Sequence, residues 1–101
     1  MRPSEILKKY WSEILGIAHK YESKGLYNIR VFGSIARGDD TEESDIDLMV
    51  DVKPEARPSL LVLIRMNNEL EQLLGVKVDL ITARSIPQRT RERVLNEAIK
   101  L

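Results

Sequence analysis

Apolar residues recur at spacings of three and four along the first quarter of the chain, which is the period of one face of an α-helix. The pattern predicts an amphipathic helix over 4–24, with Ser4 as its N-cap and Gly25 as its end. A Leu-rich stretch over 59–74 predicts a second long helix, and a sparser apolar pattern predicts a last helix over 86–101.

Three other stretches, 28–32, 45–52 and 76–82, are short, rich in branched apolar residues and suited to β-strands. In the second and third, apolar and polar residues alternate, so each strand has one apolar and one mostly polar face. The order of elements predicts a two-layer α+β (α/β) fold, in which helices cover one face of a small mixed sheet and the other face is open to solvent or a ligand. We expect residues 1–101 to form a single domain.

Aspartates on the polar faces of two predicted strands are the first candidates for chemistry. A polar connection favours an antiparallel pairing of the first two strands, whereas the helix between the second and third favours a parallel pairing. Asp47 and Asp79 then lie at similar heights on neighbouring strands, about 5 Å apart. Together with Asp45, they place three carboxylates on the open face.

Three carboxylates gathered on one face repel one another, and a divalent cation removes the conflict. Ligand sets made only of oxygen suit a hard ion such as Mg²⁺, which commonly binds one or two carboxylates together with substrate phosphates. Asp45, Asp47 and Asp79 therefore predict a Mg²⁺ site. Two such ions, about 3.5–4 Å apart, would hold the attacking and leaving oxygens of a phosphoryl-type displacement.

A phosphate-binding turn is predicted where the first strand ends. Gly33 lets the backbone approach a ligand closely, and Ser34 adds a hydroxyl at the start of a short helical turn whose N–H groups attract phosphate. Arg37, one turn further on, either adds charge-assisted hydrogen bonds to phosphate oxygens or pairs with Asp39 or Asp40 in a loop of solvated acids.

Composition narrows the class of protein. Sixteen Lys and Arg residues balance sixteen Asp and Glu residues, and a net charge of zero argues against a general nucleic-acid-binding protein. The chain has no cysteine, and its N-terminal stretch has the pattern of neither a signal peptide nor a membrane span. We therefore expect a soluble cytoplasmic protein.

The stretch FGSIARGDDTEESDIDL, residues 32–48, resembles the signature of the DNA polymerase β-like nucleotidyltransferase superfamily. That signature is an apolar residue, Gly, Gly or Ser, a spacer, and two acids separated by one apolar residue. Here it reads Phe32-Gly33-Ser34, ten residues, then Asp45-Ile46-Asp47-Leu48, with the family's third carboxylate at Asp79. The form GSIARG…SDIDL in so short a chain is similar to the minimal nucleotidyltransferases, and the match covers roughly residues 29–82.

This resemblance implies a specific activity. Minimal nucleotidyltransferases of the MntA type are antitoxins of HEPN/MNT toxin–antitoxin pairs, and they transfer AMP from ATP to a tyrosine hydroxyl of a HEPN ribonuclease toxin. The resemblance thus implies ATP as substrate, Mg²⁺ as cofactor and a HEPN toxin as partner. The chain would form either a homo-oligomer or a hetero-oligomer with the toxin. Carried over to this chain, the nucleotide-binding residues are Gly33, Ser34 and Arg37, and the metal-binding and catalytic residues are Asp45, Asp47 and Asp79. Asp79 would also help to deprotonate the acceptor hydroxyl.

Two alternatives fit the same residues. A non-catalytic antitoxin would neutralise its partner by binding alone, with a vestigial acidic site. A nucleotidyltransferase with a small hydroxylated acceptor would keep the chemistry without a toxin. Full inhibition of the partner by an Asp45→Asn/Asp47→Asn variant would favour binding over chemistry.

Overall fold

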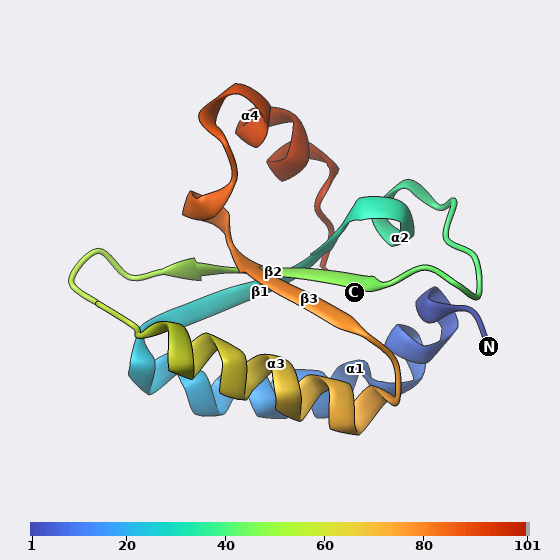
Figure 1. Cartoon of the computed structure of the whole chain (residues 1–101), viewed down its shortest axis with the longest axis horizontal. Helices are drawn as coiled ribbons and strands as arrows, with labels where there is room; N and C mark the ends of the chain where they lie inside the picture. Colours follow the sequence, from blue (N-terminus) through green and yellow to red (C-terminus); the bar gives the residue numbers. More distant parts are fainter. Residues whose placement is uncertain (101) are drawn as a thin grey trace.

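The computed structural model describes residues 1–100 of the chain and contains every predicted helix and strand (Figure 1). The helix predicted over 4–24 is divided into α1 and the tighter turn η1. No helix within residues 1–100 is both long and apolar enough to cross a membrane. In chain order the elements are α1 (Pro3–Lys20), the 3₁₀ turn η1 (Tyr21–Lys24), β1 (Leu26–Phe32), α2 (Gly33–Arg37), β2 (Ile46–Val52), α3 (Leu60–Leu74), β3 (Val78–Thr82), the 3₁₀ turn η2 (Ala83–Ser85) and α4 (Gln88–Glu97).

The three strands form one mixed sheet in the order β1-β2-β3. β1 and β2 are antiparallel, with Phe32 opposite Asp47, and β2 and β3 are parallel, with Asp47 opposite Asp79. Both predicted pairings are therefore confirmed. They follow from the connections, because the short segment of α2 and the loop after it returns the chain antiparallel, whereas α3 carries it back to begin a parallel strand.

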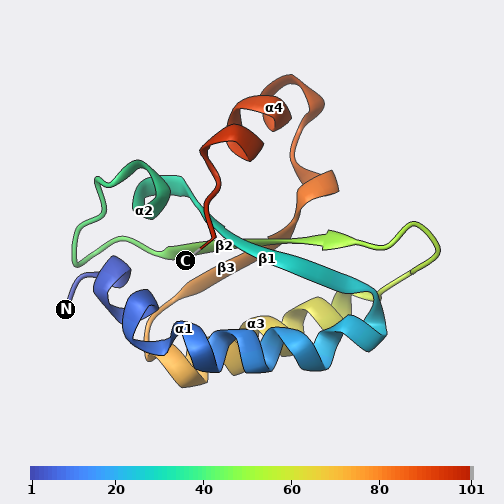
Figure 2. The same cartoon turned by 180° about the vertical axis from the view of Figure 1, so that it is seen from behind.

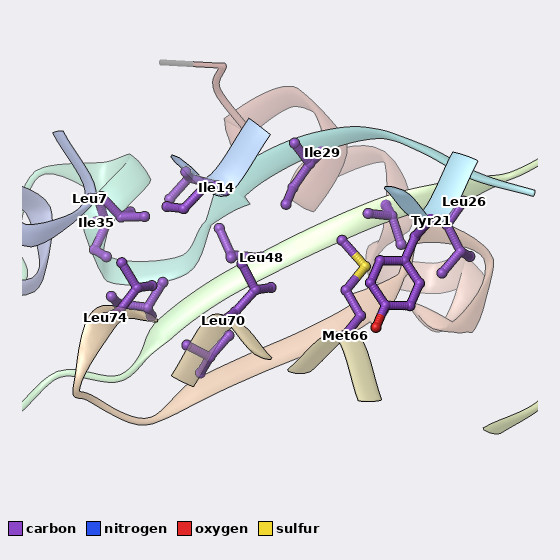
Figure 3. Close-up of a cluster of buried hydrophobic side chains, with 14 residues drawn as sticks. Leu7, Ile14, Tyr21, Leu26, Ile29, Ile35, Leu48, Met66, Leu70 and Leu74 are labelled. Carbon is purple, nitrogen blue, oxygen red and sulfur yellow. The ribbon is translucent and has the colours of Figure 1, made fainter. Parts of the chain in front are cut away.

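The main core lies between the sheet and the helices α1 and α3, which run side by side along one face (Figures 1 and 2). Both helices turn their apolar stripes to the sheet, and alternate residues of the strands point toward them. The predicted two-layer fold with a small mixed sheet is confirmed. Figure 3 shows the buried cluster, which includes Leu7, Ile14, Leu48, Met66 and Leu70.

Side chains of α3 also hold the outer edge of β3. Glu71 accepts the backbone N–H of Val78, and Asn67 accepts the backbone N–H of Leu80, each at 2.9 Å. Because β3 is an edge strand, these N–H groups face away from β2. Asp79 lies between the two anchored residues, so α3 fixes its height in the sheet.

The second face of the sheet is less open than the residue pattern predicts. α2, η2 and α4 lie on this side (Figure 1), and Met49 of β2 is fully buried there. Arg30 and Asp51 form a two-pronged ion pair across β1 and β2, with N···O distances of 3.1 and 3.0 Å. Exposed acids remain at the beginnings of β2 and β3, where Asp45 and Asp79 lie.

The C-terminal segment departs from its predicted form. The apolar pattern predicts a helix over 86–101, but α4 ends at Glu97 and the chain continues extended. Ile99 pairs with Val31 of β1 through two backbone hydrogen bonds of 2.8 and 2.9 Å. These bonds satisfy backbone groups on the outer edge of β1, which a further helical turn would leave unpaired. The predicted helix end at Leu101 lies outside the described residues.

The N-terminus of α1 holds the loop between α2 and β2. The apolar pattern predicts Ser4 as the N-cap, but the N-cap is Arg2. The side chain of Asp40 is fully buried and accepts hydrogen bonds from the Arg2 guanidinium at 2.8 Å and from the Ser4 N–H at 3.0 Å. An external carboxylate thus caps the helix, and Asp40 is a buried anchor instead of the predicted solvated loop residue.

Candidate active site

The turn from β1 into α2 brings the backbone against an acidic side chain. Gly33 has a left-handed conformation, with a φ of 73°, which favours glycine. A β-carbon at this position would overlap Oδ2 of Asp47, so only glycine leaves room for that carboxylate. Gly33 and Ser34 begin α2, and the first N–H groups of a helix have no partner within it. Backbone donors therefore lie beside the acidic residues.

Asp47 and Asp79 occupy directly opposed positions on the parallel strands β2 and β3, as predicted. Their neighbours Leu48 and Val78 belong to the core, so by alternation both aspartates point away from α1 and α3. Asp47 is half-buried, and Asp79 is exposed. The structure thus brings these two predicted site residues together on the second face of the sheet.

The electrostatics of this pair differ from those of a solvated carboxylate. Burial, together with the negative charges of Asp79 and Asp45, raises the pKa of Asp47 to about 6. The positive charge of Arg37 acts in the opposite direction without cancelling the effect. The site therefore carries excess negative charge near neutral pH, and this charge favours a bound cation.

Asp45 lies just before β2 and faces a cation of its own. It is exposed, and its Oδ2 lies 3.7 Å from Nζ of Lys77. Within residues 1–100, no three acidic or histidine side chains converge closely enough to form a ready set of metal ligands. Asp45 is therefore near enough to raise the pKa of Asp47. It does not lie close enough to Asp47 and Asp79 for the three carboxylates to form one compact cluster.

The donors present fit a magnesium ion that is shared with a substrate. Mg²⁺ is usually bound by one or two carboxylates, while water and phosphate oxygens take the remaining positions, so a complete protein cage is not required. Asp47 and Asp79 offer carboxylates from opposed positions. The turn at Gly33 and Ser34 offers backbone donors for phosphate next to them.

Arg37 ends α2 beside two carboxylates from different parts of the chain. Its Nε lies 3.6 Å from Asp39, and its Nη1 lies 3.8 Å from Glu97 of α4. Asp39 is one of its two predicted partners, whereas the other, Asp40, is engaged by Arg2. No sequence signal points to Glu97, because it lies far along the chain among the many charged residues of α4.

Comparison with known proteins agrees with this geometry. The family model described as the nucleotidyltransferase domain matches residues 6–101. The protein adenylyltransferase MntA of Thermococcus cleftensis is 41% identical over 85 residues, which cover 81% of this chain and 84% of that protein. A solved structure provisionally described as a minimal nucleotidyltransferase matches with a TM-score of 0.77 at 39% identity, over 94% of this chain and 95% of that one. A mutant of the toxin–antitoxin MntA–HpeT matches with a TM-score of 0.70 at 26% identity, over 89% and 69% of the two chains.

The family match extends over nearly the whole described fold, and it includes the Gly-Ser turn and the opposed aspartates. The match covers most of the length of these relatives, so the likeness is not confined to the motif. This chain therefore belongs to the nucleotidyltransferase domain family, as a minimal adenylyltransferase of the MntA type.

Proposed function

We propose that this chain is a Mg²⁺-dependent protein adenylyltransferase that silences a toxin by transferring AMP from ATP to it, and that the acceptor is a tyrosine of a HEPN ribonuclease. The observation that carries the proposal is the opposition of Asp47 and Asp79 beside the turn at Gly33. The likeness to MntA of T. cleftensis, named a protein adenylyltransferase, supports a protein acceptor. The likeness to the toxin–antitoxin MntA–HpeT supports a toxin partner.

The proposed nucleotide site is the turn that begins α2. Backbone N–H groups at Gly33 and Ser34 would bind the triphosphate, and the guanidinium of Arg37 would add charge-assisted hydrogen bonds. Asp47 and Asp79 would hold Mg²⁺, and Asp45 would join them on leaving Lys77. When bound, Mg²⁺ neutralises charge on the phosphates and carboxylates and so favours attack at phosphorus.

In the proposed transfer, the acceptor oxygen forms a bond to the α-phosphorus of ATP. The bond from that phosphorus to the oxygen bridging the α- and β-phosphates breaks, and pyrophosphate leaves. The hydroxyl proton passes to a carboxylate, for which we propose Asp79, because it is exposed to an acceptor that arrives from solvent. Asp47, half-buried against Gly33, would keep its position throughout.

The test is label transfer to the protein encoded by the adjacent gene. With Mg²⁺ and ATP labelled at the α-phosphate, that protein should retain label, whereas ATP labelled at the γ-phosphate should leave none. Asp47→Asn should abolish the transfer. Glu55→Gln, the same loss of charge at an exposed residue of the β2–α3 loop, should not.

Each part of the proposal has its own refuting result. Absence of transfer by the wild-type chain would refute the activity, and label on a residue type other than tyrosine would refute the acceptor. An Asp45→Asn/Asp47→Asn variant that neutralises the toxin in full would show that binding alone is sufficient.

A further inference from the structure

The C-terminal helix α4 reaches the site although none of its residues belongs to the predicted motif. It lies on the same side of the sheet as α2 (Figure 1), and the two helices are in contact. No residue of α4 is fully buried, so apolar packing contributes little to its position. A polar helix of this kind depends on specific contacts with its surroundings.

Two contacts near the end of α4 reach β1 and the helix α2 that follows it. Ile99 pairs with Val31 of β1 through two backbone hydrogen bonds, and Glu97 lies 3.8 Å from Arg37. Val31 lies two residues before Gly33, so β1 leads through α2 to Arg37 and also pairs with Ile99, two residues after Glu97. The edge pairing of β1 and the approach of Glu97 to Arg37 therefore lie at the same end of α4.

The two carboxylates occupy only part of the Arg37 guanidinium. Asp39 lies near Nε and Glu97 near Nη1, while Nη2 has no ion pair within residues 1–100. A guanidinium with carboxylates near two of its nitrogens can present its remaining donors to a phosphate oxygen. Arg37 ends the short helix that Gly33 begins, and Asp47 lies against Gly33, so these donors lie near the proposed triphosphate site.

We propose that Glu97 is a positioning residue that holds the Arg37 guanidinium for the phosphate groups of ATP, so that α4 contributes to nucleotide binding through Arg37. This inference rests on the proposed function, because it takes the turn at Gly33 as the triphosphate site. The Arg37 side chain is 47% exposed, and without a partner it would lose conformational freedom when nucleotide binds. Glu97 restricts that freedom beforehand, so its effect falls on affinity and not on the chemical step.

The test is the dissociation constant of AMP-PNP in the presence of Mg²⁺, measured by calorimetry on the full chain. Glu97→Gln should raise it about threefold to fivefold, and Glu97→Asp, which keeps the charge, should restore most of the affinity. Glu92→Gln is the matched control, because Glu92 is an exposed acid of the same helix. In an Arg37→Ala background, Glu97→Gln should cause no further loss. The kcat of transfer at saturating ATP should stay unchanged.

The outcomes separate this inference from the proposed function. If the wild-type chain did not bind AMP-PNP in the presence of Mg²⁺, this inference and the proposed function would both be overturned. If the wild type binds, an unchanged dissociation constant for Glu97→Gln would overturn the positioning role alone. A merely structural Glu97 would lower the melting temperature without nucleotide and would weaken binding equally in the Arg37→Ala background, and that result would also overturn it.

Discussion

The raised pKa of Asp47 predicts that Asp47→Asn stabilises the metal-free protein while it abolishes transfer. Burial and the charges of Asp79 and Asp45 disfavour the ionised carboxylate in the folded state only. The stability contributed by an acid with a raised pKa is fully present below its unfolded pKa of 3.8, and it is lost as the pH rises through about 6. Asparagine has the same shape without the charge and does not lose this stability.

The size of the effect follows from the two pKa values. Each tenfold change in an acid constant corresponds to about 1.36 kcal/mol, so the difference between 3.8 and about 6 corresponds to about 3 kcal/mol near pH 8. Asp47 is only half-buried, and solvent screening reduces this free energy to about 1.5 kcal/mol. For a domain of this size, the melting temperature should rise by about 6–12 °C.

The assay is thermal unfolding in EDTA between about pH 4.5 and pH 8, with Glu55→Gln as the control for loss of an exposed charge. The margin of Asp47→Asn over the wild type should be clearly smaller at about pH 4.5 than near pH 8, since the pH is then only slightly above the unfolded pKa. Added Mg²⁺ should stabilise the wild type more than the variant. Equal stability near pH 8, or a margin that does not depend on pH, would refute this account of the site.

Three further predictions follow from contacts around the motif. Gly33→Ala should lower the free energy of unfolding by about 1–2 kcal/mol and abolish AMP-PNP binding, because the β-carbon overlaps Asp47; normal affinity would contradict the proposed role of the turn. Asp79→Asn should lower the pKa of Asp47, measured by NMR titration, and an unmoved midpoint would show that the two charges are not coupled. Asp40→Ala should lower the free energy of unfolding by about 2 kcal/mol at neutral pH, as measured by urea denaturation. Burial alone would raise the pKa of Asp40, but hydrogen bonds, led by that from Arg2, lower it to about 2. The difference between wild type and Asp40→Ala should therefore persist above pH 3.8 and vanish as the pH falls toward 2, and a difference that does not change with pH would count against the ion pair.

The opposition of Asp47 and Asp79 was predictable from the sequence because it depends on two general rules. Side chains alternate along a strand, and a helix between two strands of one sheet makes them parallel. Neither rule requires knowledge of side-chain contacts. The end of α3 was predictable for a similar local reason, because Gly75 takes the left-handed conformation that stops a helix.

Contacts between distant polar residues were not predictable in this way. Asp40 is one of several acids in GDDTEES, and only the folded chain shows its carboxylate buried at the start of α1. Glu97 is one of many charged residues in α4, and its neighbour Arg37 is remote in sequence. Charged residues are mostly exposed in proteins, so residue type gives no signal for such exceptions. The pairing of Ile99 with β1 likewise depends on an edge that exists only after the sheet has formed.

Assembly with another protein is constrained by the way the sheet ends on both sides. On β3, Glu71 and Asn67 already accept outward N–H groups. On β1, the backbone N–H and C=O of Val31 are hydrogen-bonded to Ile99. An irregularity at Asn28, with a φ of 58°, interrupts the regular strand. Within residues 1–100, neither edge of the sheet therefore presents a regular row of free backbone groups to which a strand of another protein could hydrogen-bond. Recognition of a partner is left to the side chains of helices and loops, which can diversify without disturbing the strands that carry the aspartates.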